Sequence, residues 1–214
     1  MSITRVKFCG MTRARDVESA VEAGANAIGF VCHLASPRYV APGHLKDLGR
    51  SVPLFVTPVL LFVNADTDRI ERALEAVPNA LLQFHGDETA AQCARYARPY
   101  LRAIRMLDGF DLLDCEREFA SASGLLADTP TEGYGGSGRG FDWARVPAAS
   151  ARTKPLVLAG GLTAMNVAAA VALVRPYAVD VSSGIEESPG IKSVEKMQRF
   201  IAAVRAADFA REPR

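Results

Sequence analysis

Short apolar runs alternate with amphipathic stretches along the whole chain. Each apolar run is four to six residues long, which is typical of parallel strands that are buried on both faces. The runs are Arg5–Cys9, Ala27–Cys32, Val59–Val63, Ala80–Phe84, Leu101–Met106, Leu125–Asp128, Leu156–Ala159 and Val179–Ser182. The pattern therefore predicts eight parallel strands.

Helical patterns fill the segments between these runs. Their apolar residues recur three or four positions apart, so one face of each helix would pack against the strands. Thr163 and Ser193 are the expected N-caps of the two clearest helices. The predicted helices are Arg15–Ala23, Thr67–Val77, Thr163–Val174 and Ser193–Ala207. The pattern is weakest for the fifth and sixth helices of the series.

Eight units of strand and helix predict a single (β/α)8 TIM barrel over residues 1–214. Dividing 214 residues by eight gives about 27 residues per unit, near the lean end of the range for such barrels. A doubly wound open sheet also alternates, but it usually has a Gly-x-Gly-x-x-Gly turn after its first strand. Here that turn reads Cys9-Gly10-Met11-Thr12, so the barrel is favoured.

The composition gives no sign of several classes of function and location. The chain has 25 Lys and Arg against 24 Asp and Glu, a formal net charge of +1, and no long block of like charges. This balance gives no general reason to bind nucleic acid or an anionic membrane. No run approaches the roughly 20 apolar residues of a membrane span, and the first residues lack the apolar core of a signal peptide. The four cysteines show neither a CxxC pair nor metal-ligand spacing, so we expect a reduced, cytoplasmic protein.

Two glycine-containing loops carry the strongest chemical signal. In a barrel, the functional residues gather at the C-terminal ends of the strands, and phosphate sites recur after strands seven and eight. Glycines let the backbone approach an anion closely, and N–H groups at the start of a short helix donate to it. The predicted phosphate site comprises Gly160, Gly161, Ser182, Ser183 and Gly184. Tight turns alone would also explain either loop taken singly.

Cys9 and Asp128, at the ends of the first and sixth strands, are candidates for proton transfer. A lone cysteine is more often a small buried apolar residue, but at the barrel mouth a helix dipole or a cation would favour its thiolate. The residues before Asp128 form an apolar strand, which places the Asp128 carboxyl at the mouth of the barrel. There it would serve as a general acid or, more simply, as a turn carboxylate. A thiolate and a carboxylic acid together suit proton transfer on a sugar.

Two loops beyond the strand ends are candidates for substrate contact. Arg38, in Ser36-Pro37-Arg38-Tyr39, could pair with a carboxylate, although an exposed loop arginine is usually only solvated. Tyr134–Gly140 is rich in glycine and follows Asp128 along the chain. We interpret it as an active-site flap in preference to a flexible connector.

Five motifs in order along the chain resemble the phosphoribosylanthranilate isomerase family. They are Lys7–Thr12, Ser36–Tyr39, Leu82–Gly86, Gly135–Gly138 with Phe141–Trp143, and Val179–Glu186. The resemblance covers essentially Arg5 to Phe200, with Phe8 and Phe84 where the family usually has an aliphatic residue. It implies an Amadori rearrangement of N-(5-phosphoribosyl)anthranilate to 1-(2-carboxyphenylamino)-1-deoxyribulose 5-phosphate, in tryptophan biosynthesis, with no metal and no redox cofactor.

The resemblance also implies roles for individual residues. Asp128 would protonate the ribose ring oxygen as general acid, and Cys9 would remove the C2′ proton as general base. Arg38 would hold the anthranilate carboxylate, His85 and Asp180 would line the substrate pocket, and the glycine-containing loops would hold the phosphate. The expected partner is a small phosphosugar, and the expected assembly is a monomer or a homodimer.

Three other functions remain open on the sequence alone. A metal-dependent phosphopentose epimerase would use strand-end histidines and Asp180 as metal ligands. The pattern of such epimerases also has an aspartate two residues after the histidine that corresponds to His33. This chain has Ala35 at that position. The histidine-pathway Amadori isomerase has an aspartate in place of Cys9. A non-catalytic barrel that binds a sugar phosphate would need neither Cys9 nor Asp128.

Overall fold

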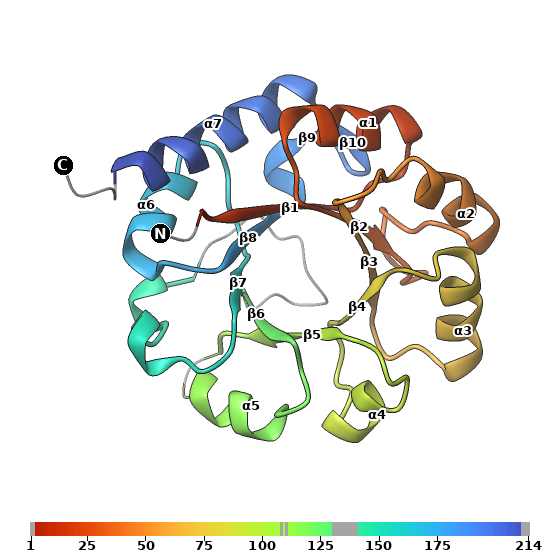
Figure 1. Cartoon of the computed structure of the whole chain (residues 1–214), viewed down its shortest axis with the longest axis horizontal. Helices are drawn as coiled ribbons and strands as arrows, with labels where there is room; N and C mark the ends of the chain where they lie inside the picture. Colours follow the sequence, from red (N-terminus) through yellow and green to blue (C-terminus); the bar gives the residue numbers. More distant parts are fainter. Residues whose placement is uncertain (1–2, 108, 110, 130–140, 211–214) are drawn as a thin grey trace.

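The computed structural model describes residues 3–107, 109, 111–129 and 141–210, and within these the chain forms a closed barrel of eight parallel strands (Figure 1). The strands are β1 (Arg5–Cys9), β2 (Ala27–Val31), β3 (Thr57–Phe62), β4 (Leu81–Phe84), β5 (Tyr100–Arg105), β6 (Gly124–Asp128), β7 (Leu156–Leu158) and β8 (Ala178–Val181). Because β8 pairs with β1, the main sheet has no open edge. The predicted (β/α)8 barrel is confirmed, and every predicted strand ends within two residues of the observed one.

Helices surround the barrel on its outside (Figure 1). They are α1 (Ala14–Ala23), α2 (Pro42–Arg50), α3 (Thr67–Ala76), α4 (Ala90–Ala94), α5 (Leu112–Glu118), α6 (Val167–Val174) and α7 (Val194–Ala210). Ser193 is confirmed as the residue before α7, where its hydroxyl accepts the N–H of Lys196. No helix of the described chain is long and apolar enough to cross a membrane.

The predicted N-cap at Thr163 is wrong, since α6 begins only after Asn166. Thr163 Oγ1 accepts the N–H of Met165, two residues ahead, and this local bond forms a turn where a helix start was expected. Asn166 closes the turn by accepting the N–H of Thr163 and donating to the carbonyl of Gly161. The turn therefore stabilises the loop after β7, and α6 begins at Val167 rather than directly after Thr163.

The sixth unit departs most from the expected repeat. Between β6 and β7 the described residues form no α-helix, only the short 3-10 turns η1 (Trp143–Arg145) and η2 (Ala149–Ala151). The predicted flap, Tyr134–Gly140, lies outside the described residues. The weak helical pattern of this unit agrees with the absence of an α-helix in its described part.

Side chains alternate along each strand between the helix layer and the barrel interior. On β1, Phe8 faces outward and meets Phe200 of α7 edge-on, with ring centroids 5.9 Å apart. Two separate apolar clusters lie on the inner strand faces, one on β5 to β8 and one around the ends of β1 to β3. Several other inward-facing side chains are buried and polar, and they include Lys7, Gln83 and Asp180.

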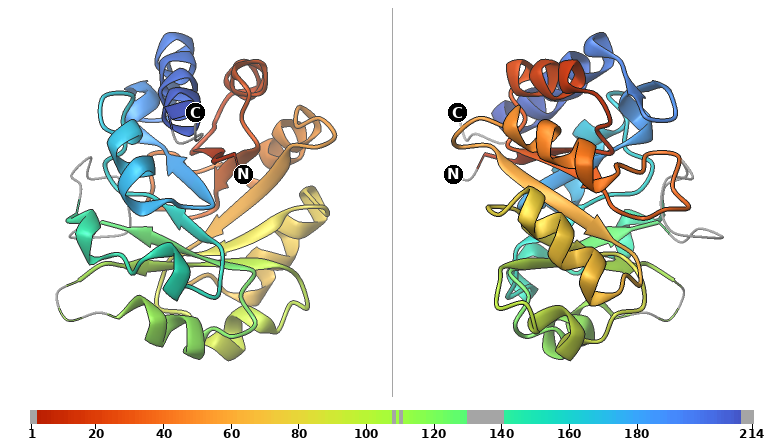
Figure 2. Two further views of the ribbon diagram at one scale, coloured as in Figure 1. Left: turned by 60° about the vertical axis from the view of Figure 1, so that its left-hand side comes forward. Right: turned by 90° about the vertical axis from the view of Figure 1, so that its right-hand side faces the viewer.

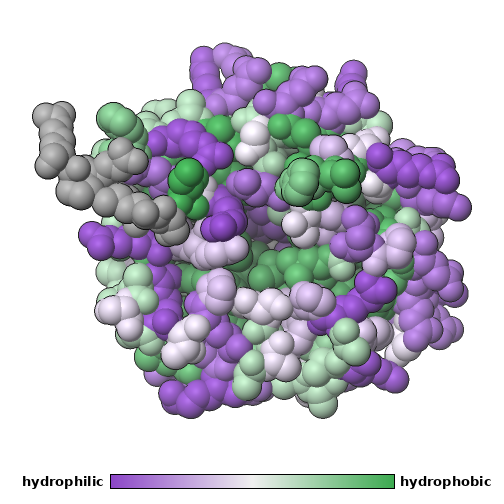
Figure 3. Space-filling model, viewed as in Figure 1, coloured by the Kyte–Doolittle hydropathy of each residue, from purple (hydrophilic) through white to green (hydrophobic). Residues whose placement is uncertain are grey.

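A small hairpin follows the barrel and lies beside α1 (Figure 1). After β8 come the 3-10 turn η3 (Ser183–Ile185) and the antiparallel strands β9 (Glu186–Ser188) and β10 (Ile191–Lys192). The start of β1 and the C-terminal part of α7 lie side by side (Figure 2), and Asp208 of α7 accepts two hydrogen bonds from Thr4. In the face shown in Figure 3, hydrophilic residues lie around much of the rim and hydrophobic residues gather nearer the centre.

Candidate active site

Cys9 lies at the mouth of the barrel at the end of β1. Gly29 of β2 is its neighbour in register, and a Cβ at that position would lie 2.7 Å from the thiol sulfur, so the glycine makes room for the thiol. Burial raises the pKa of the Cys9 thiol, Asp180 adds to this rise, and the cations Lys7 and Lys192 offset it only in part. The expected cation is present, but burial outweighs it, and the thiol is the favoured form in the free protein.

Lys7 is the cation that shares the inner face of β1 with Cys9. Its Nζ donates to both carboxylate oxygens of Asp180, each at 2.9 Å, and the two residues are neighbours in the β1–β8 register. Burial alone would lower the pKa of Lys7, but Asp180 and Cys9 raise it above its ordinary value. No role was predicted for Lys7, although a lysine in phase with Cys9 inside an apolar strand was a signal for one.

Asp128 is joined to β4 by a chain of side-chain contacts. His85 Nε2 lies 3.0 Å from Asp128 Oδ2, and Gln83 Nε2 lies 3.1 Å from His85 Nδ1. With the Gln83 amide as donor, the imidazole carries its proton on Nε2 and donates it to Asp128. The N–H of Thr129 donates to the other oxygen of Asp128 at 2.8 Å. Both ring nitrogens of His85 are thus occupied by protein groups.

The predicted phosphate loops after β7 and β8 pack against each other. A Cβ on Gly184 would clash with the carbonyl oxygen of Leu162, and one on Gly160 would clash with Thr129. Gly160 and Gly161 have φ of 84° and 64°, in the left-handed region that favours glycine. In the described part of the chain, no acceptor pairs with the N–H of either glycine. The pair therefore offers two backbone donors at the mouth.

Arg38 reaches from the loop after β2 towards the loop after β8, passing over Gly10. A Cβ on Gly10 would lie 2.5 Å from Arg38 Cδ and 2.9 Å from Ser182 Oγ, and Gly10 itself has a φ of 77°. Only glycine fits this position, because it combines a close approach with a left-handed backbone. The structure thus brings the predicted Arg38 and Ser182 to the same side of the mouth.

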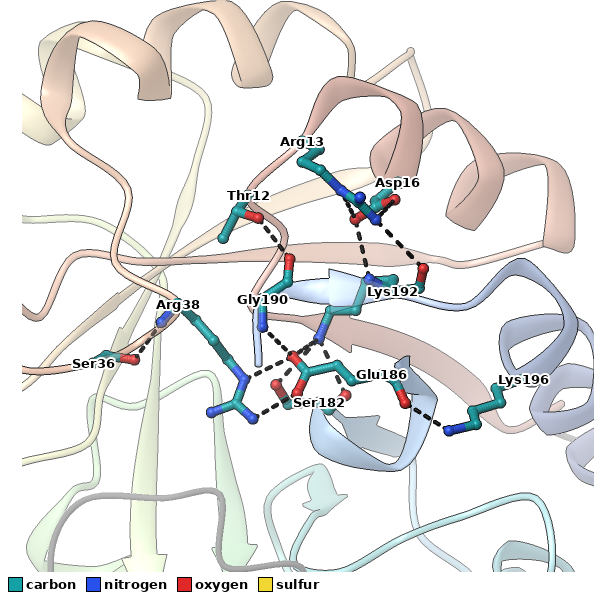
Figure 4. Close-up of polar contacts among 10 residues, drawn as sticks. All are labelled: Thr12, Arg13, Asp16, Ser36, Arg38, Ser182, Glu186, Gly190, Lys192 and Lys196. Atoms are coloured by element: carbon teal, nitrogen blue, oxygen red, sulfur yellow. Dashed lines mark hydrogen bonds and ion pairs between the residues drawn. The ribbon is translucent and has the colours of Figure 1, made fainter. Parts of the chain in front are cut away.

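Glu186, the first residue of β9, holds the Arg38 guanidinium in place (Figure 4). Arg38 Nε and Nη2 donate to its two oxygens at 2.8 and 2.7 Å, and Lys192 Nζ donates to Oε1 at 2.7 Å. Burial would raise the pKa of Glu186, but the hydrogen bonds from Arg38 and Lys192 outweigh it and lower that pKa. No role was predicted for either Glu186 or Lys192, and nothing in the sequence pattern distinguishes Lys192 from a surface lysine.

The geometry also bears on the epimerase hypothesis. His85 contacts Gln83 and Asp128, whereas Asp180 contacts Lys7, so these two residues are not gathered as ligands. Throughout the described ranges, no group of three or more His, Cys, Asp or Glu side chains is placed to hold a metal ion. The side chains at the mouth are arranged in ion pairs and hydrogen-bonded chains.

Comparisons with known proteins agree with one another. Residues 6–203 match the family model described as N-(5'phosphoribosyl)anthranilate (PRA) isomerase. A relative from Methylibium petroleiphilum, named N-(5'-phosphoribosyl)anthranilate isomerase, is 56% identical over 205 residues, which are 96% of this chain and 95% of the relative.

Two solved structures extend the similarity to three dimensions. Phosphoribosyl anthranilate isomerase from Thermotoga maritima is similar with a TM-score of 0.85 and 37% identity, over 95% of this chain and 99% of that one. A phosphoribosyl anthranilate isomerase in complex with reduced 1-(o-carboxyphenylamino)-1-deoxyribulose 5-phosphate is similar with a TM-score of 0.81 and 33% identity, over 95% and 99% of the two chains.

Proposed function

The chain belongs to the N-(5'-phosphoribosyl)anthranilate isomerase family, and from that premise we propose that it converts N-(5-phosphoribosyl)anthranilate to 1-(2-carboxyphenylamino)-1-deoxyribulose 5-phosphate. Membership confirms the resemblance carried by the five sequence motifs. The observation that carries the proposal is the family match over residues 6–203, in a barrel whose mouth gathers a thiol, a carboxyl group and glycine-containing loops.

Asp128 is the proposed general acid. It delivers a proton to the ribose ring oxygen, the bond from that oxygen to C1′ breaks, and a Schiff base forms between C1′ and the anthranilate nitrogen. His85 acts through Asp128 as a positioning residue, because its N–H fixes one carboxyl oxygen at 3.0 Å. The predicted contact of His85 with substrate stays a prediction.

Cys9 is the proposed general base. Its thiolate takes the proton from C2′, the electron pair moves towards the Schiff base nitrogen to give an enolamine, and tautomerisation gives the ketone. The burial that disfavours the Cys9 thiolate also makes it a stronger base once it forms. Lys7 supplies the positive charge beside the thiolate, and Asp180 holds Lys7.

We propose separate groups for the two anionic ends of the substrate. Gly160, Gly161 and the Ser182–Gly184 loop receive the phosphate, because glycine N–H groups are open there and the following 3-10 turn adds donors. Arg38 receives the anthranilate carboxylate. The reaction moves protons within one molecule, and we propose that it needs neither metal nor redox cofactor.

The setting follows from the same premise. We propose a cytoplasmic enzyme of tryptophan biosynthesis that acts as a monomer or a homodimer, with a small phosphosugar as its ligand and no nucleic-acid or membrane partner. The formal net charge of +1 supports the absence of such anionic partners.

One assay tests the function as a whole. Phosphoribosylanthranilate is fluorescent, and it can be generated in situ and followed with and without the protein. The protein should accelerate the loss of this fluorescence in proportion to its concentration. An unchanged decay rate at micromolar protein would contradict the proposal.

A further inference from the structure

Three buried charged side chains meet beside the loop after β8 (Figure 4). The side chains of Arg38, Glu186 and Lys192 are 12%, 4% and 0% exposed. Lys192 Nζ lies near three oxygens, Glu186 Oε1 at 2.7 Å, the Ser182 carbonyl at 3.1 Å and Ser182 Oγ at 3.4 Å. Three acceptors match the three N–H groups of an ammonium, so we assign formal charges of +1, −1 and +1 and a net charge of +1 to the cluster.

A pair of Arg38 and Glu186 alone would be electrically neutral. A carboxylate arriving at Arg38 would then also meet the carboxylate of Glu186, and like charges in a buried site repel strongly. Lys192 changes this balance, because its charge is matched to Glu186 and leaves one positive charge for the incoming anion. In Figure 4, the third guanidinium nitrogen of Arg38 points away from Glu186, and it has no partner among the described residues.

We propose that Lys192 is a positioning residue that offsets the charge of Glu186 and thereby allows Arg38 to bind the aryl carboxylate of the substrate. The proposal rests on the proposed function and deepens it. Glu186 is the intermediary, since it receives Lys192 on Oε1 and orients the guanidinium through both oxygens.

The hairpin that carries Lys192 is fixed by contacts that do not involve its ammonium group. The N–H of Lys192 donates to Asp16 at 3.2 Å, Thr12 Oγ1 donates to the Gly190 carbonyl at 2.6 Å, and the N–H of Gly190 donates to Glu186 at 3.2 Å. The first bond ties β10 to α1, the second ties the hairpin turn to the loop after β1, and the third lies within the hairpin. Replacing the Lys192 side chain should therefore leave the hairpin in place.

Two product analogues separate the carboxylate from the rest of the ligand. One is reduced 1-(2-carboxyphenylamino)-1-deoxyribulose 5-phosphate, and the other is its phenylamino counterpart without the carboxylate. Lys192→Met should weaken binding of the first analogue by about ten- to a hundredfold, the range for lost interactions with a charged group. Lys192→Met should change the affinity for the second analogue by less than about threefold from that of the unmodified protein. The two analogues share the phosphate and the sugar, so only the carboxylate distinguishes them.

A second variant tests charge balance against simple packing. Adding Glu186→Gln to Lys192→Met removes the uncompensated carboxylate and restores a net charge of +1 at Arg38. The double variant should recover about tenfold of the lost affinity for the carboxylated analogue. Lys196→Met is the matched control, because Lys196 is exposed and, among the described residues, its ammonium group donates only to the main-chain oxygen of Glu186, at 2.6 Å. It should bind both analogues as the unmodified protein does.

Titration calorimetry gives the dissociation constants, and circular dichroism verifies that each variant is folded. Equal weakening of both analogues by Lys192→Met would overturn the proposal and leave the proposed function intact. A double variant that binds the carboxylated analogue no better than Lys192→Met would overturn it as well. If the unmodified protein bound neither analogue, the proposed function would fall and this inference with it.

Discussion

Replacing Lys7 with methionine should suppress ionisation of the Cys9 thiol. The change removes the cation on the same strand face and leaves Asp180, which had been paired at 2.9 Å, as a buried anion near the thiol. Both effects disfavour a thiolate, because Lys7 lowers the pKa of Cys9 and Asp180 raises it. The expected result is a less reactive cysteine.

The size of the effect follows from the spacing of the strand. Same-face residues two apart on a strand are separated by about 6.6 Å. At that distance and an effective dielectric constant of about 20, a unit charge contributes about 2.5 kcal/mol. Losing it should reduce the thiolate population, and the alkylation rate with it, about 70-fold at a fixed mildly alkaline pH.

Alkylation by iodoacetamide, followed by mass spectrometry of the Cys9 peptide, measures this rate. The other three thiols provide slow internal references, because burial raises the pKa of Cys32 and Cys93 to about 12 and that of Cys115 to about 11. Adding Asp180→Asn to Lys7→Met removes the stranded anion and should recover part of the rate. If Lys7→Met alone reacted at the rate of the unmodified protein, Lys7 would have no electrostatic role at Cys9.

Three further predictions concern other parts of the site. Gly161→Val should raise KM about tenfold or more with little change in kcat, because valine is strained at a φ of 64° and would displace an N–H of the proposed phosphate site. An unchanged KM would place the phosphate elsewhere. Glu186 has a lowered pKa in the folded state, so its contribution to the free energy of unfolding is present above its ordinary pKa of 4.5 and is lost as pH falls below it. Urea unfolding across acidic pH should therefore show a steeper loss for the unmodified protein than for Glu186→Gln, and parallel curves would refute this. Chelator-treated protein should keep full activity, whereas recovery only with a divalent ion would revive the epimerase hypothesis.

The barrel was predictable because its signals are local. Apolar runs such as Val59–Val63 are buried at every residue, so the pattern alone marks them as parallel strands. Thr163 misled because a threonine can close a turn as well as cap a helix, and the choice depends on Asn166 three residues later.

The candidate site was predictable only where it depends on position along a strand. Cys9 and Asp128 end strands, and the barrel rule brings strand ends together. The ion pairs depend instead on how the barrel closes, since Lys7 meets Asp180 across 173 positions and Arg38 meets Glu186 across 148. No local sequence pattern determines the register between β1 and β8 or the path of the hairpin after β8. The partners of these charged side chains are therefore known only from the three-dimensional structure.

We propose that Cys9 and Asp128 carry the two proton transfers of the isomerisation. The most direct test of this proposal is the single-turnover rate of phosphoribosylanthranilate conversion by Cys9→Ser and by Asp128→Asn, with the affinity for the reduced product analogue measured alongside. Each variant should lose about 10²- to 10⁴-fold in rate, as expected for a missing acid or base, and should bind the analogue nearly as tightly as before. Turnover of Cys9→Ser or Asp128→Asn at the unmodified rate would show that the missing group is not the acid or base.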